Sequence, residues 1–177
     1  MLTLATTGSA LLAIDLQARL MPAIAGGDAV LRNVGRLVKA ARRLAVPVLF
    51  TEQNPRGLGA TAPELAPQPG EVAEKMSFDA LRAPGLEGRL DAERAFLVAG
   101  CEAHVCVLQT VLGLLAAGRK VYVVADAVGS RDPENRRLAL DRMARHGAEI
   151  VSTEMVLFEW LGDANHPDFR EIVALIK

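Results

Sequence analysis

The chain has 177 residues and a formal net charge of −1, from 20 basic and 21 acidic side chains. This balance lacks the basic excess of a nucleic-acid-binding protein, so no nucleic-acid partner is expected. Two cysteines are too few for a disulfide scaffold, and the most apolar stretch is shorter than a membrane span, so no membrane partner is expected. The length suits one domain over residues 1–177, and the first residues lack the pattern of a secretory signal, so we expect a cytoplasmic protein.

Apolar strand segments alternate with amphipathic helical segments, which is typical of a parallel α/β sheet. The sequence predicts strands at 10–14, 47–51, within 93–100, 120–125 and 149–152, and helices at 29–44, 104–117, 133–146, 155–161 and 167–176. We therefore expect a three-layer α/β/α Rossmann-like open sheet, mainly parallel, with about five to six strands and helices on both faces.

The segment 54–70 is rich in proline and glycine and has no regular apolar pattern. A loop of this length inside a compact domain is usually functional or mobile. Because the core pattern continues on both sides of it, we interpret this segment as a flap over a site rather than as a linker between domains.

Polar residues follow the predicted strands at their carboxyl ends, where ligands bind in open parallel sheets. Asp15 ends the first strand, and Gln53 follows the second. Cys106 falls in the first turn of the helix after the third strand, where unpaired N–H groups and the helix dipole favour a thiolate. Position alone leaves open a packing role for Cys106, a loop-capping role for Asp15 and a solvated surface position for Lys75.

Five ordered segments carry a resemblance to a known family. They are LLAIDLQ (11–17), TEQNPRGLG (51–59), EKMSFDA (74–80), GCEAHVCVLQT (100–110) and VVADAVGSR (123–131). On these segments the chain resembles the isochorismatase-like cysteine hydrolase superfamily, and most closely the isochorismatase-domain-containing proteins. The resemblance implies that Asp15 and Lys75 are catalytic and that Cys106 is the nucleophile.

The same resemblance implies how a substrate carbonyl is held and attacked. It implies a cis peptide bond between Cys101 and Glu102, with the backbone N–H groups of Glu102 and Cys106 forming an oxyanion hole. Asp15 would take the proton of Cys106, and Lys75 would favour the thiolate. A small amide or related carbonyl compound would then be hydrolysed through a thioester on the cysteine.

Two departures from named members of the superfamily narrow the expected activity. Metal-dependent nicotinamidases carry an Asp-x-His segment and further histidines after the second strand, whereas residues 52–56 here are EQNPR. We therefore expect no metal and no other cofactor. True isochorismatases lack the nucleophilic cysteine, so Cys106 argues against isochorismate as the substrate.

Four residues beside these motifs are expected to line the pocket of a small-molecule substrate: Gln17, Gln53, Phe78 and His104. The superfamily forms dimers and larger rings, so the resemblance implies a homo-oligomer. The alternative is a catalytically silent protein that uses this fold for binding or scaffolding. A nucleotide-binding Rossmann domain is disfavoured, because no glycine-rich phosphate loop follows the first strand.

Overall fold

The computed structural model of the chain describes residues 3–90 and 94–177. In this part of the chain, six parallel strands form one sheet in the order β3-β2-β1-β4-β5-β6. The strands are β1 (Ser9–Ile14), β2 (Val48–Gln53), β3 (Val72–Lys75), β4 (Ala95–Cys101), β5 (Val121–Gly129) and β6 (Glu149–Val151). The predicted Rossmann-like sheet is confirmed; position 93, at the start of the third predicted strand, lies outside the described residues.

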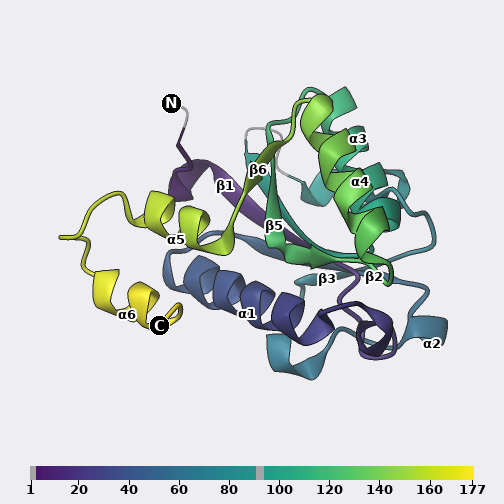
Figure 1. Cartoon of the computed structure of the whole chain (residues 1–177), viewed down its shortest axis with the longest axis horizontal. Coiled ribbons are helices and arrows are strands. Elements are labelled where there is room, and N and C mark those ends of the chain that lie inside the picture. Colours follow the sequence, from purple (N-terminus) through teal and green to yellow (C-terminus); the bar gives the residue numbers. More distant parts are fainter. Residues whose placement is uncertain (1–2, 91–93) are drawn as a thin grey trace.

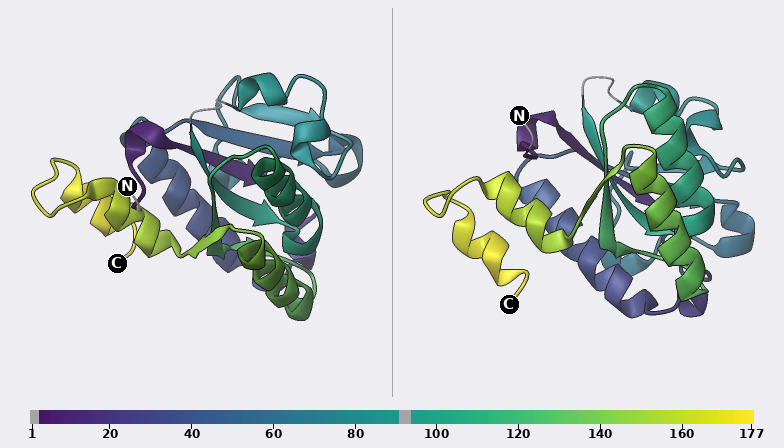
Figure 2. Two further views of the ribbon diagram at one scale, coloured as in Figure 1. Left: turned by 90° about the horizontal axis from the view of Figure 1, so that it is seen from above. Right: turned by 45° about the horizontal axis from the view of Figure 1, so that its top comes forward.

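Helices cover both faces of the sheet (Figure 1). One face carries α1 (Gly27–Arg43), α5 (Thr153–Leu161) and α6 (Phe169–Ala174), the other carries α3 (Leu108–Ala116) and α4 (Pro133–Arg145), and α2 (Pro55–Leu58) lies in the connection after β2. Figure 2 shows the sheet between these two helical layers. None of the described helices has the length and apolar character needed to span a membrane.

Side chains alternate along β4 between two apolar layers. Leu97 packs in the layer that contains α1 and α5, while Phe96 and Val98 pack in the layer that contains α3 and α4. All three side chains are almost fully buried. Burial on both faces explains why this strand is a continuous apolar run in the sequence.

The order of the strands creates a crevice at one end of the sheet. β1 and β4 are neighbours, although β2 and β3 lie between them in the chain. The connections that leave β1 and β4 therefore run to opposite sides, and ligands of open α/β sheets bind beyond the carboxyl ends of the strands at such a switch point. Asp15 directly follows β1, and Cys101 ends β4.

Three elements differ from the sequence prediction. β3 was not expected, because its four residues are too few to establish a strand pattern. The helix predicted from residue 104 begins with a π turn (Ala103–Val107) before α3. β5 continues through Asp126 instead of ending at residue 125, and the Asp126 carboxylate accepts a hydrogen bond of 2.8 Å from the Thr153 N–H at the start of α5.

Residues 54–62 form what we call the site wall, the first part of the segment interpreted above as a flap. The site wall is bound to residues 16–19 by backbone hydrogen bonds of 2.8, 2.9 and 3.1 Å and by an antiparallel bridge between Gln17 and Thr61. It is therefore a hydrogen-bonded side of the crevice rather than a free flap.

Candidate active site

Asp15 is the first residue after β1, and its side chain is buried. Its φ of 50° lies in the left-handed region, which aspartate tolerates better than most residues. The Asp15 N–H donates to the carbonyl of Thr51 on β2 at 3.1 Å, and the Thr51 hydroxyl donates to Oδ1 of Asp15 at 2.6 Å. β2 therefore fixes the orientation of the carboxylate.

Lys75 is the last residue of β3, and its Nζ lies 2.7 Å from Oδ2 of Asp15. The ammonium also donates to Oε1 of Gln53 at 2.9 Å and to the carbonyl of Ser77 at 3.3 Å. The side chains of Lys75 and Asp15 are 0% and 1% exposed. In this buried pair each charge is balanced by the other, and the Lys75 ammonium has an acceptor for each of its three N–H groups. Removing either partner would leave an uncompensated buried charge.

Cys106 lies in the π turn that follows β4, and the Cys101–Glu102 peptide bond before this turn is cis. The Cys106 side chain is close enough to Asp15 and Lys75 for both to influence its pKa. Burial and the negative charge of Asp15 raise the pKa of Cys106 to about 12, while Lys75 opposes the rise. The direction of this shift favours the thiol form of Cys106, so burial opposes the preference for a thiolate that a helix terminus provides.

A pocket of about 400 Å³ opens onto Asp15 and Cys106. Its lining includes Asp15 and Cys106 together with the apolar side chains of Leu58, Phe78 and Val105. Phe78 is 49% exposed, so it lies at the rim. A pocket of this size and mixed lining suits a small molecule.

The four pocket residues suggested by the sequence separate into two pairs. Gln53 and Phe78 line the pocket, whereas Gln17 and His104 are not among its lining residues. Gln17 is buried; its Nε2 donates to two backbone carbonyls at 2.6 and 3.1 Å, and its Oε1 accepts from the Gln53 N–H at 2.9 Å. His104 Nδ1 lies 3.0 Å from Oγ of Ser130. Gln17 therefore holds the site wall to β2 instead of contacting the pocket.

Two arginines that the sequence analysis did not single out also line the pocket, Arg19 and Arg131. The backbone N–H and Nε of Arg131 donate to Oε2 of Glu102 at 2.9 and 3.1 Å. Burial of Glu102 opposes the shift, yet the hydrogen bonds and charge of Arg131 hold the pKa of that carboxyl below its usual range. Both arginines follow the carboxyl end of a strand by a few residues, which is the sequence signal that identifies them.

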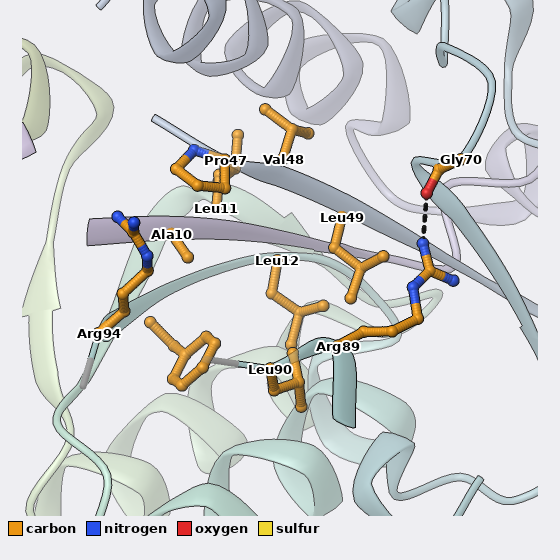
Figure 3. Close-up of a pocket in the computed structure, with 11 residues that line it drawn as sticks. Ala10, Leu11, Leu12, Pro47, Val48, Leu49, Gly70, Arg89, Leu90 and Arg94 are labelled. Atoms are coloured by element: carbon orange, nitrogen blue, oxygen red, sulfur yellow. Dashed lines mark hydrogen bonds between the residues drawn. The ribbon is translucent and has the colours of Figure 1, made fainter. Parts of the chain in front are cut away.

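Another pocket, of about 410 Å³, lies at the amino ends of β1, β2 and β4 (Figure 3). Its surface is apolar, with side chains such as Leu12 and Leu49, and it is flanked by Arg89 and Arg94. As far as the chain is described, no cysteine, histidine, aspartate or glutamate lines it. The pocket at the amino ends of the strands therefore has neither a nucleophile nor a general base. The pocket at Cys106 has both and is the candidate active site.

Comparisons with known proteins identify the family to which this fold belongs. The family model described as isochorismatase domain matches residues 9–155. Isochorismatase domain-containing protein 2 of Homo sapiens is 40% identical over 172 residues, which cover 96% of this chain and 83% of the relative.

Three solved structures share the whole fold. The MAR1 ribonuclease from Caenorhabditis elegans is 36% identical, with a TM-score of 0.93 and coverage of 98% of this chain and 92% of that one. YcaC from Pseudomonas aeruginosa, with hexane-2,5-diol and covalent acrylamide, is 27% identical, with a TM-score of 0.90 and coverage of 98% and 91%. Escherichia coli YcaC, described as an octameric hydrolase of unknown specificity, is 26% identical, with a TM-score of 0.87 and coverage of 98% and 96%. Because the domain matches residues 9–155 and a relative is 40% identical over 96% of this chain, the chain belongs to the isochorismatase domain family.

Proposed function

We propose that the chain is a metal-independent cysteine hydrolase that cleaves a small amide or related carbonyl compound through a thioester on Cys106. The observation that carries the proposal is that Cys106 and Asp15 line one pocket and that Asp15 forms a buried ion pair with Lys75. A nucleophile next to a base that is itself oriented by a third group is the general arrangement for covalent catalysis.

The first half of the reaction begins from the protonated thiol, because the pKa of Cys106 is about 12. As Sγ attacks the substrate carbonyl, its proton passes to Asp15, the C–S bond forms, and the carbonyl electrons move to the oxygen. Lys75, which lowers the pKa of Cys106, stabilises the charge that develops on sulfur. The backbone N–H groups of Glu102 and Cys106 bind the oxyanion in this proposal.

The second half restores the enzyme. The tetrahedral intermediate collapses with cleavage of the C–N bond, and Asp15 returns its proton to the departing amine. Asp15, again a carboxylate, then removes a proton from water as the water attacks the thioester. The carboxylic acid product leaves, and the proton passes from Asp15 to Cys106. Thr51 and Lys75 keep the carboxylate in one orientation through both halves.

A relative supports a reactive nucleophile on this fold. YcaC from Pseudomonas aeruginosa carries covalent acrylamide, and acrylamide is an electrophile to which thiols add. In this chain both cysteines line the pocket, but Cys101 is 0% exposed and Cys106 is 6% exposed. Cys106 is therefore the cysteine that we expect the same reagent to modify.

The reaction needs no metal in this proposal. Residues 52–56 contain no histidine. Over residues 3–90 and 94–177, no group of three or more histidine, cysteine, aspartate or glutamate side chains is placed to hold a metal ion. The side chains available there do not offer the donor set of a catalytic zinc site.

The test is turnover of a panel of small primary amides. Ammonia release measures turnover, and mass spectrometry of the intact protein detects an acyl adduct. We expect turnover and an acyl adduct on Cys106 in the native protein, unchanged after dialysis against EDTA. In Cys106→Ser and Asp15→Asn, turnover falls by about 100-fold or more, the scale of general acid–base catalysis. Full turnover by Asp15→Asn would remove that residue from the mechanism. Absence of turnover and adduct with every amide would favour the catalytically silent binding protein.

Ribonuclease activity is a second candidate, favoured by the relative described as MAR1 ribonuclease. The pocket of about 400 Å³ is sized for a small molecule rather than for a polynucleotide. A formal net charge of −1 also gives no general attraction for phosphates. Amide hydrolysis is therefore the first candidate. Cleavage of a labelled RNA by the native protein, lost in Cys106→Ser, would instead favour the ribonuclease.

We also propose that the chain assembles as a homo-oligomer, because E. coli YcaC is described as octameric. Light scattering after size-exclusion chromatography measures the mass directly. A particle of 18.9 kDa, the mass of one chain, would contradict the proposal.

A further inference from the structure

The charged groups around the pocket are paired, with one exception. Lys75 neutralises Asp15 at 2.7 Å, and Arg131 neutralises Glu102 at 3.1 Å. Among the ion pairs of residues 3–90 and 94–177, none includes Arg19, although Arg19 lines the pocket. The pocket therefore carries one uncompensated positive charge, and it belongs to a guanidinium.

The site wall holds this guanidinium from one side. Nη1 of Arg19 donates to the carbonyls of Arg56 and Gly57, both at 3.3 Å. The aliphatic stem lies over Gly59, with Cγ and Cδ at 3.4 and 3.7 Å from the position that a Cβ on Gly59 would occupy. Gly59 has a φ of +80°, so glycine also suits the backbone there. Arg19 is an exposed residue, and these contacts orient its side chain along the site wall.

The hydrogen bonds to the site wall leave one edge of the Arg19 guanidinium available for a ligand. In the described contacts, the two carbonyls use Nη1, and neither Nε nor Nη2 has a partner. The N–H groups of Nε and Nη2 are parallel and match the two oxygens of a carboxylate, which is why arginine binds carboxylates in a bidentate manner.

The rest of the pocket is mostly apolar, through Leu20, Ala23, Leu58, Phe78 and Val105. We propose that Arg19 is the specificity-determining residue for a carboxylate, so that the preferred substrate is the monoamide of a short dicarboxylic acid. Its amide carbonyl lies at Cys106, its carboxylate at Arg19, and a hydrocarbon spacer between them contacts the apolar walls. The position of the amide at Cys106 rests on the proposed hydrolase function, whereas the position of the carboxylate at Arg19 does not.

The first experiment measures binding without turnover, in a Cys106→Ser protein, by titration calorimetry. The monoamides of succinic, glutaric and adipic acid are compared with butanamide, pentanamide and hexanamide, which replace the carboxylate by a methyl group. We expect at least one acid amide to bind about 10- to 100-fold more tightly than its neutral counterpart, the range for hydrogen bonds between charged groups. Equal binding, or tighter binding of the neutral amides, would overturn the proposal.

The second experiment adds Arg19→Met to the same protein. The acid amide then binds as weakly as the neutral one, while the affinity of the neutral amide stays unchanged. Arg32→Met on α1 is the matched control, because it removes the same charge from an exposed residue outside the pocket lining. A preference that survives Arg19→Met, or that Arg32→Met removes equally, would overturn the role of Arg19.

Turnover by the native protein separates the two proposals. If the acid amide is hydrolysed, Arg19→Met raises KM and leaves kcat nearly unchanged, because binding of the distal group is the same in the ground and transition states. A fall in kcat with unchanged KM would overturn the specificity role. If the acid amide binds through Arg19 but is never hydrolysed, the hydrolase proposal fails and the carboxylate site stands.

Discussion

Asp15 acts on Cys106 in two opposing ways in the proposed mechanism. Its negative charge adds to the effect of burial and raises the pKa of the thiol to about 12, yet the same carboxylate accepts the proton during attack. Lys75 acts in the other direction and lowers that pKa. The reactivity of the resting thiol and the rate of turnover therefore respond differently to the same substitutions.

We predict the alkylation of Cys106 by iodoacetamide as a function of pH. In the native protein the rate keeps rising as the pH increases toward about 12, because the fraction of reactive thiolate grows until the pH reaches the pKa. Asp15→Asn removes the negative charge, lowers the pKa and speeds alkylation at pH 9, with about tenfold for each unit of pKa. Lys75→Met raises the pKa and slows alkylation.

Peptide mapping provides the internal control for this prediction. Burial also raises the pKa of Cys101 to about 12, and its side chain is 0% exposed, so Cys101 stays slower than Cys106 in every variant. Circular dichroism checks that each variant is folded, since both substitutions disrupt a buried ion pair. Fast alkylation of the native Cys106 at neutral pH, or no acceleration in Asp15→Asn, would contradict the electrostatic account.

The sequence indicated candidate residues for the site more readily than the residues that form hydrogen bonds with them. Asp15, Lys75 and Cys106 lie in motif segments at strand ends, and the structure brings them together. Thr51 was not singled out, because its hydrogen bond to Asp15 depends on the register of β1 against β2. Arg19 was not singled out either, although it follows the carboxyl end of β1 by five residues, because the sequence does not distinguish it from other exposed arginines.

At the scale of elements, Glu52 connects β2 to the site wall. Its Oε1 accepts hydrogen bonds from the N–H of Thr61 at 2.6 Å and from the Thr61 hydroxyl at 2.7 Å. Glu52 is 7% exposed, so both bonds are shielded from water. Because Leu58 of the site wall lines the pocket, this contact connects the stability of a loop to the shape of the site.

We predict that Glu52→Ala loosens the site wall. The substitution removes both hydrogen bonds and leaves a buried N–H without its acceptor, which costs about 1–3 kcal/mol. Hydrogen exchange then becomes faster in residues 58–62, while the strands β1 and β4 keep their protection. Glu74→Ala is the control, since Glu74 is the register partner of Glu52 on β3 and is exposed. Equal acceleration in both variants would contradict the prediction.

Short and irregular elements escaped the sequence analysis for physical reasons. β3 has the sequence VAEK, in which two charged residues hide the strand pattern, yet this strand carries Lys75 to the site. The π turn at Ala103–Val107 continues into α3 with helical apolar spacing, so no pattern separates it from an α-helix. Long, buried elements such as β4 were recognised because their apolar runs leave little choice.

At the scale of the whole molecule, both apolar layers depend on the same sheet. Leu37 of α1 lies in one layer and Leu114 of α3 in the other, and each side chain is almost fully buried. Leu97 and Val98, consecutive on β4, face opposite layers. Loss of either layer exposes one face of the shared sheet, so neither layer is expected to unfold alone.

We predict that Leu37→Ala and Leu114→Ala shift the same cooperative transition in urea, measured at one protein concentration because assembly changes apparent stability. Each substitution creates a cavity in a packed layer and costs about 2–5 kcal/mol. The slope of unfolding free energy against urea stays unchanged, because the surface exposed on unfolding is the same.

The alternative is that the two layers are separate cooperative units. Unfolding would then occur in two steps, with Leu37→Ala shifting one and Leu114→Ala shifting the other, and the sequence-based expectation of one domain over residues 1–177 would be wrong. A single transition moved by both variants supports one domain. It also bears on the site, because Asp15 and Cys101 sit at the ends of β1 and β4. If the sheet unfolds as one unit, a cavity in either layer lowers the population of the assembled site without changing any contact within it.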